Sequence, residues 1–125
     1  SNSNIRRLQG FRLAHESNSF SYFIAQTLIR NFDTVVKPNI DAIIKGRDFL
    51  SGYCNKIGFN TWGKYGNFVL IDAETKERMQ KIVDKLEEER VFVKSHYPEP
   101  LSSYITVTAG PLEAMELVGS LIESS

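Results

Sequence analysis

The side chains that most often do chemistry in proteins are scarce in this chain and far apart. The two histidines, His15 and His96, fall in different segments, and Cys54 is the single cysteine. A catalytic histidine needs a nucleophile or a carboxylate within hydrogen-bond distance, and the sequence spacing shows neither. We interpret both histidines as loop residues and Cys54 as a packed or half-exposed thiol. One thiol excludes an internal disulfide and a cysteine-based metal cluster.

Two further motifs have chemical side chains at close spacing. Residues 87–90 read "EEER", but four successive residues point around a helix and not toward one another. We interpret them as a solvated helix end. Residues 62–66 read "WGKYG", which has the glycines of a flexible loop but not the spacing of a phosphate-binding loop. From its residues alone, the chain shows no self-contained active site.

Composition indicates one soluble domain. The chain has 125 residues, of which 42% are hydrophobic and 24% charged, and its formal net charge is zero. A nucleic acid or an anionic membrane attracts proteins with a basic excess, so we expect neither as a partner. The apolar runs are too short for a membrane span and no signal peptide is recognisable. We expect a cytoplasmic protein without a bound metal.

Apolar residues at three- and four-residue spacing predict four helices. The first begins at Phe20. The second has Asp33 or Thr34 as its N-cap and Pro38 in its first turn, and ends near Lys56. The third covers residues 75–90, and the fourth follows Gly110 with Pro111 at its first position.

Three runs of strand length lie between these helices, at residues 67–73, 91–95 and 104–110. The first, "NFVLIDA", is continuously apolar, which predicts burial on both faces. We read residues 58–66 and 96–103 as turns and loops. The fold class predicted is α+β, with α/β layers, in which helices cover a small sheet of about three to four strands.

The segment order resembles a known small domain. Gly66 to Ile71 reads "GNFVLI", Arg90 to Lys94 reads "RVFVK", Thr106 to Glu113 reads "TVTAGPLE", and Arg47 to Leu50 reads "RDFL". Together these motifs resemble the C-terminal small domain of the fold-type I, class I/II, pyridoxal-phosphate-dependent aminotransferases, closest to the histidinol-phosphate aminotransferase-like group. The resemblance implies this small-domain fold for residues 19–125.

The same resemblance gives a reading of the opening residues, "SNSNIRRLQGFR". In the family, the cofactor lysine lies in Ser-x-Ser-Lys-x-x-x-Leu-x-Gly-x-Arg, so residues 1–18 resemble an extended cofactor-lysine segment. It implies that Ser1 and Arg12 bind the cofactor phosphate and that Asn4 stands at the position of the Schiff-base lysine. Asparagine is neither nucleophilic nor basic, so it cannot replace the lysine. Ser1-Asn2 is also compatible with the remnant of a cloning tag.

Two more departures from the family follow. Thr106 occupies the position at which the family has an arginine for the substrate carboxylate, and the family's large domain would precede residue 1. The resemblance therefore implies a C-terminal part of an aminotransferase that moves an amino group between an amino acid or amine and a 2-oxo acid. It also implies a large domain, a homodimer partner and pyridoxal 5'-phosphate in the complete protein. We expect the chain alone to be inactive and not to bind the cofactor tightly.

The alternative function is a stand-alone α/β interaction or regulatory module without catalysis. The small domain of an aminotransferase should expose an apolar patch where the large domain or the dimer partner packs. A wholly polar surface would favour the module.

Overall fold

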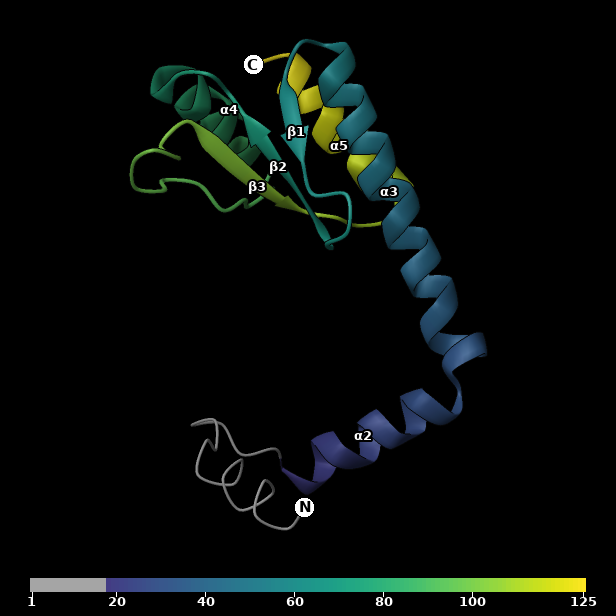
Figure 1. Cartoon of the computed structure of the whole chain (residues 1–125). Helices are drawn as coiled ribbons and strands as arrows, with labels where there is room; N and C mark the ends of the chain where they lie inside the picture. The colour runs from purple at the N-terminus through teal and green to yellow at the C-terminus, as the bar shows by residue number, and fades with distance from the viewer. Residues whose placement is uncertain (1–17) are drawn as a thin grey trace, which may run out of the picture. The chain divides into compact units, whose positions relative to one another are not determined.

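The computed structural model describes residues 18–125, which form two compact units that divide between Lys37 and Pro38. The described residues contain four α-helices, one π-helical segment and a three-stranded antiparallel sheet. The α+β fold class is therefore confirmed (Figure 1).

The first unit is helical. Helix α2 (Ser19–Arg30) starts at Asn18, whose side-chain oxygen accepts a hydrogen bond of 2.7 Å from the backbone N–H of Ser21. The π-helix η1 (Phe32–Val36) follows after Asn31 and continues directly into helix α3 (Lys37–Lys56). The existence of both α-helices, the place of Pro38 and the end near Lys56 are confirmed.

The predicted cap of the second helix is wrong. Asp33 and Thr34 lie inside η1, and the hydroxyl of Thr34 donates backward to the carbonyl of Asn31 at 3.3 Å. The backbone is already helical at these two residues, so they do not precede a free helix end. Sequence alone does not separate a capping hydroxyl from one that bonds to the preceding turn.

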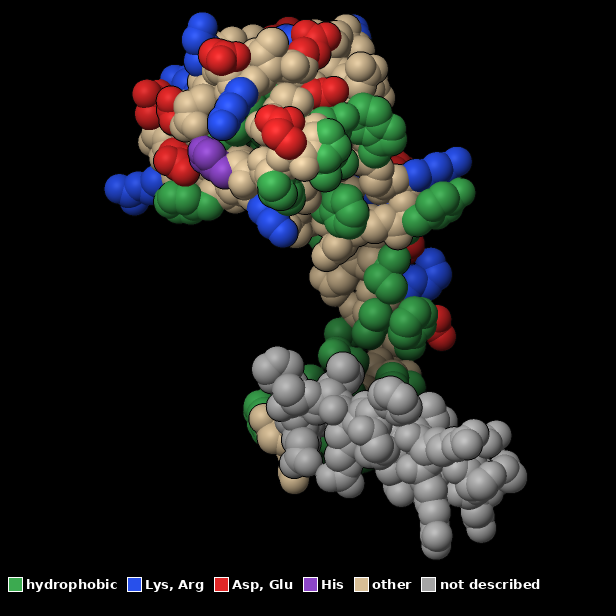
Figure 2. All heavy atoms as spheres, turned by 60° about the vertical axis from the view of Figure 1, so that its left-hand side comes forward, with side chains coloured by type: hydrophobic (Ala, Val, Ile, Leu, Met, Phe, Trp, Pro, Cys, Tyr) green, Lys and Arg blue, Asp and Glu red, His purple; other side chains and the backbone are tan. Residues whose placement is uncertain are grey.

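Hydrophobic side chains of the first unit are uncovered within this chain. No residue between 18 and 37 is buried. Phe20, Phe23 and Ile29 are 72%, 66% and 72% exposed. Figure 2 shows hydrophobic side chains, in green, at the surface of the helical stretch that leads into the sheet domain. These positions have the spacing of an amphipathic helix, and the described residues of the first unit do not bury them.

The sheet of the second unit consists of β1 (Asn60–Trp62), β2 (Phe68–Asp72) and β3 (Tyr104–Thr108), in that order across the sheet. Strand β1 lies in a stretch predicted to be turns, since it is only three residues long and partly polar. The strand predicted at 91–95 is wrong. Only Lys94 of that segment pairs with the sheet, through an isolated bridge to Thr106.

Two more helices complete the second unit. Helix α4 (Lys76–Glu88) is capped by Thr75, whose hydroxyl accepts from the N–H of Arg78 at 3.1 Å. Helix α5 (Leu112–Glu123) follows Pro111, which is its N-cap and not its first helical residue as predicted. In both cases the predicted start of the helix is within one residue of the observed start.

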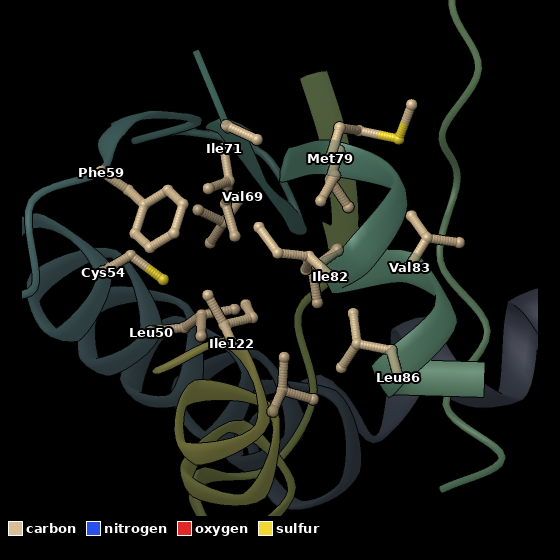
Figure 3. Close-up of a cluster of buried hydrophobic side chains, with 14 of the residues drawn as sticks. Leu50, Cys54, Phe59, Val69, Ile71, Met79, Ile82, Val83, Leu86 and Ile122 are labelled. Carbon is tan, nitrogen blue, oxygen red and sulfur yellow. The ribbon is translucent and has the colours of Figure 1, made fainter. Parts of the chain in front are cut away.

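Helices α3, α4 and α5 pack on one face of the sheet. The labelled side chains in Figure 3 converge from all three helices and from β2. Along β2, Val69 and Ile71 are buried, whereas Phe68 and Leu70 are not. The predicted burial of β2 on both faces is therefore wrong. The run is continuously apolar, but only alternate residues reach the core.

Helix α3 approaches the connection between β3 and α5 closely at Gly46. A Cβ atom added there would lie 2.0 Å from the carbonyl oxygen of Gly110. By contrast, a Cβ atom at Gly52 of the same helix would meet nothing within 4 Å. The absence of a side chain at Gly46 therefore sets how near α3 lies to this loop.

Candidate functional site

The face of the sheet opposite the core carries a row of four side chains. In the antiparallel register Trp62 pairs with Leu70, and Leu70 pairs with Thr106. Thr106 in turn forms the isolated bridge with Lys94. Residues directly opposite each other in antiparallel pairs project to the same face. The row therefore runs from an aromatic side chain at one edge to an ammonium group at the other.

The bridge between Thr106 and Lys94 is made by two backbone hydrogen bonds. The N–H of Lys94 donates to the carbonyl of Thr106 at 3.1 Å, and the N–H of Thr106 donates to the carbonyl of Lys94 at 2.7 Å. The side chains of Thr106 and Lys94 also share a neighbour, Tyr97. The hydroxyl of Tyr97 lies 2.7 Å from Oγ1 of Thr106, and Nζ of Lys94 lies 5.2 Å from the centre of the Tyr97 ring.

Aromatic and acidic groups lie beside this row. The rings of Trp62 and Tyr104 are 5.7 Å apart between centroids. Oδ1 of Asp72 accepts hydrogen bonds from the hydroxyl of Ser103 and from the N–H of Glu74, both at 2.8 Å. Burial of the Tyr104 hydroxyl, with the nearby Asp72 carboxylate, raises the pKa of Tyr104. Tyr104 is thus held as a neutral phenol beside Trp62.

A groove lies between α3 and the β1–β2 hairpin. This groove has a volume of about 550 Å³, and Arg47, Asp48, Thr61 and Trp62 are among its lining residues. The guanidinium of Arg47 is committed to protein partners. Nε and Nη2 donate to Oδ1 of Asp48 at 3.0 and 2.7 Å, and Nη1 donates to the carbonyl of Gly66 at 3.1 Å.

Three more polar side chains of the groove hydrogen-bond to one another. The hydroxyls of Ser51 and Thr61 are 2.7 Å apart, and the Thr61 hydroxyl donates to Asn55 at 3.1 Å. The groove therefore joins the hairpin to α3 through satisfied hydrogen bonds.

The predicted loop histidine His96 is exposed. Its Nε2 lies 3.0 Å from Oε1 of Gln80, and its Nδ1 lies 2.7 Å from the hydroxyl oxygen of Ser95. These contacts attach the loop to α4.

Of the two environments predicted for Cys54, the packed one is confirmed: the side chain is fully buried, and burial raises the pKa of its thiol to about 12. A thiol in this environment stays protonated and unreactive. The charges at residues 87–90 are exposed, as expected of a solvated helix end. No group of three or more His, Cys, Asp or Glu side chains that could hold a metal ion occurs within residues 18–125.

Three of the four predicted site residues lie outside the described residues. These are Ser1, Asn4 and Arg12, and His15 lies there too. The fourth, Thr106, lies at the centre of β3 in the row of four side chains. Their predicted roles stay predictions.

Sequence reasoning missed the neighbours of Thr106. Lys94 belongs to a segment read as a strand, and Tyr97 to a segment read as a loop. Their proximity to Thr106 depends on the register of one bridge, which no local pattern specifies. The sequence shows which residue types are present, but not that Lys94 and Tyr97 lie beside Thr106.

With the fold and this surface described, comparison with known proteins gives one informative similarity. No protein-family model matches the chain. The chain is 33% identical, over 75 residues, to a histidinol-phosphate aminotransferase of Clostridium botulinum (strain Langeland / NCTC 10281 / Type F). The match covers 60% of this chain and 21% of that protein. The chain thus has an aminotransferase-like region that spans about a fifth of the length of its relative.

The described helices were compared with the length and polarity that a membrane span requires. Within residues 18–125, every helix is too short or too polar to cross a membrane.

Proposed function

We propose that this chain is the C-terminal part of an aminotransferase-like protein and has no catalytic activity by itself. The observation that carries the proposal is the 33% identity over 75 residues to a histidinol-phosphate aminotransferase. In the complete protein, the reaction class is the transfer of an amino group between an amino acid or amine and a 2-oxo acid.

The uncovered hydrophobic side chains supply a second, independent argument. Phe20, Phe23 and Ile29 are each more than half exposed, and they occupy one helix together with other exposed apolar residues. So many exposed hydrophobic side chains on one helix are unusual on the surface of a complete monomeric protein. This surface favours a part of a larger protein, in which a large domain and a second copy of the chain are the proposed partners. It counts against a stand-alone module with a polar surface.

The residues predicted to hold pyridoxal phosphate, Ser1, Asn4 and Arg12, lie outside the described residues. When bound to a complete enzyme, this cofactor supplies an aldehyde that takes up the amino group and a ring that withdraws electrons. Its phosphate needs free donors, which the guanidinium of Arg47 does not offer because it is paired with Asp48 and Gly66. Asn4 lacks the amine that the aldehyde requires. We therefore derive no reaction step through the cofactor.

The first test is the coding sequence upstream of Ser1. We expect it to encode an aminotransferase large domain. An upstream sequence of any other kind, or a start codon directly before Ser1, would contradict the proposed origin.

The second test examines the proposed inactivity. The purified chain is mixed with pyridoxal phosphate, and we expect no visible absorbance band of a cofactor–lysine adduct, since residue 4 is asparagine. In the complete protein, Asn4→Lys should produce such a band, removable by borohydride, while the unchanged protein should not. A specific band with the unchanged protein would show that another lysine performs this role.

A further inference from the structure

We propose that Ser95 is a reactive serine, a covalent modification site that takes up an acyl group from an activated ester or thioester with His96 as its base. The site lies on the segment between α4 and β3. The inference goes beyond the proposed function and does not depend on it. Each chain takes up one acyl group without turnover, and no amino group is transferred.

A continuous series of hydrogen bonds links Ser95 to helix α4. The hydroxyl oxygen of Ser95 lies 2.7 Å from Nδ1 of His96, and Nε2 of the same ring lies 3.0 Å from Oε1 of Gln80. The amide nitrogen of Gln80 donates in turn to Oδ1 of Asp84 at 2.8 Å. Both ring nitrogens are therefore engaged, one with a hydroxyl and the other with a side-chain amide.

The carboxylate of Asp84 sets the direction of this series. A carboxylate only accepts, so Gln80 turns its amide nitrogen to Asp84 and its oxygen to His96. An amide oxygen also only accepts, and the network therefore assigns the proton of the neutral imidazole to Nε2. Nδ1 is left as the acceptor that faces the Ser95 hydroxyl. A hydroxyl, a base and a group that orients the base are the parts of an activated nucleophile, and an amide takes the third place in Cys-His-Asn arrangements.

The backbone holds Ser95 and His96 from both sides. Lys94 exchanges two backbone hydrogen bonds with Thr106, and the hydroxyl of Tyr97 lies 2.7 Å from Oγ1 of Thr106. Between these anchors, His96 has a φ of 60°, in the left-handed region that residues other than glycine seldom adopt. Such a conformation persists only where the surrounding structure imposes it. Tertiary contacts thus fix the contact between these two neighbours in the sequence.

The partner of the Ser95 hydroxyl distinguishes it from a second serine of the same connection. Ser102 donates to the carboxylate of Glu99 at 2.6 Å, and a carboxylate is a much weaker base than a neutral imidazole. Ser95 is half-buried and His96 is exposed. A small ester can therefore reach the Ser95 hydroxyl from solvent while the imidazole stays beside it.

The acyl group passes from the donor to Ser95 by one substitution at the carbonyl carbon. Oγ of Ser95 forms the new bond to this carbon, and Nδ1 of His96 takes the hydroxyl proton. The bond between the carbon and the leaving oxygen or sulfur then breaks, and His96 returns the proton to the departing group. The products are a serine ester, a neutral imidazole and a free alcohol or thiol. Phenols and thiols depart as weak bases, which is why the proposed donors are activated esters and thioesters.

The test is acetylation of the 125-residue chain by p-nitrophenyl acetate, followed by nitrophenolate release and by peptide mass spectrometry. We expect Ser95 to acquire an acetyl group faster than any other serine or threonine of the chain. Hydroxylamine removes an acetyl ester from serine but leaves an acetyl amide on lysine, so this treatment separates the two products.

Substitutions in this segment identify the base. His96→Gln keeps a polar side chain without the imidazole and should slow acetylation of Ser95 about a hundredfold, a value typical of a lost general base. Ser95→Ala should abolish the ester at this position. The matched control is Ser102→Ala, which removes the carboxylate-bonded hydroxyl of the same connection and should leave the rate at Ser95 unchanged. The amide spectrum of each variant establishes that it is folded.

Gln80 acts as a positioning residue, and a pair of substitutions tests this role. Gln80→Leu removes the oxygen that faces Nε2 of His96 and should slow acetylation, whereas Gln80→Glu retains an acceptor and should restore most of the rate. The nitrogen chemical shifts of the His96 ring give a second readout. In the neutral ring of the unchanged chain the proton should reside on Nε2, and in Gln80→Leu it should be shared between both nitrogens.

Three results would overturn the reactive serine. They are acetylation of Ser95 no faster than that of Ser102, a rate at Ser95 that His96→Gln leaves unchanged, and nitrophenolate release that Ser95→Ala does not reduce. Each of them leaves the proposed origin to the upstream coding sequence, which does not depend on this reaction. Conversely, a rapid and imidazole-dependent ester at Ser95 together with an unrelated upstream sequence would retain the reactive serine and refute the aminotransferase proposal.

Discussion

The helical residues 18–37 and the sheet domain 38–125 both place hydrophobic residues at helical spacing, but only the sheet domain buries them. In α4, Met79, Ile82 and Leu86 are at most 1% exposed. In α2, residues with the same kind of spacing, such as Phe20 and Phe23, are 72% and 66% exposed. The pattern predicts both helices correctly. It does not tell which of them has its packing partner within the same chain.

The comparison separates two kinds of information in an amphipathic helix. The period of the apolar residues fixes the conformation and the face that needs covering. The identity of the covering surface depends on long-range topology. In the sheet domain this surface is the inner face of β2 and β3, whereas none of the described residues of α2 is buried.

The largest difference in stability is expected between substitutions of two isoleucines, one in each region. Ile71→Ala removes a fully buried side chain from β2 and should lower the free energy of unfolding by about 2–5 kcal/mol, since a cavity remains in the core. Ile29→Ala, at a side chain that is 72% exposed, should change it by less than about 0.5 kcal/mol. Urea unfolding of both variants measures the contrast. Similar losses in both would mean that α2 packs on the domain in solution.

Most of the fold follows from the sequence, and the failures have local causes. The four α-helices and strands β2 and β3 were predictable from apolar spacing, caps and β-branched residues. Strand β1 was not, because three partly polar residues between turns carry almost no periodic signal. The apolar run 91–93 resembles a strand, but a strand also needs a partner with free backbone groups, and only Lys94 pairs.

A smaller effect is expected from two glycines of the same helix. Gly46→Ala places a Cβ atom 2.0 Å from the Gly110 carbonyl oxygen, so α3 or the loop must shift, at a cost of about 1–3 kcal/mol. Gly52→Ala meets no atom within 4 Å and should stabilise the helix by about 0.5–1 kcal/mol. Opposite signs in thermal unfolding would confirm that close packing, and not helix propensity, governs position 46. Stabilisation by both substitutions would refute the close approach.

The candidate site was less predictable than the fold. The family resemblance identifies Thr106 as a site residue. The register of the sheet then places Thr106 on the face opposite the core. Its hydroxyl partner, Tyr97, and the ammonium of Lys94 come from a segment without regular structure. Such neighbours depend on loop conformation, for which residue type and spacing carry little information. The predicted residues 1, 4 and 12 lie outside the described residues.

The last prediction uses the one buried thiol of the sheet domain. Burial raises the pKa of Cys54 from 9.0 to about 12 in the folded chain. Above pH 9 the unfolded chain therefore releases the thiol proton while the folded chain retains it. Unfolding becomes more favourable as the pH rises, by up to about 1.4 kcal/mol per pH unit. The stabilisation is complete below pH 9 and is lost between pH 9 and 12.

Other groups titrate in the same range, so the measurement is the difference between the unchanged chain and Cys54→Ala. Urea unfolding at several values between pH 7 and 11 should show the unchanged chain losing its advantage over the variant as the pH rises. A constant difference would indicate that the thiol ionises equally in both states and is reached by water. Residues 18–37 supply the contrast, since none of them is buried and no such desolvated group lies among them. The pH dependence therefore reports on the closed core of the sheet domain and leaves the exposed residues of α2 unaffected.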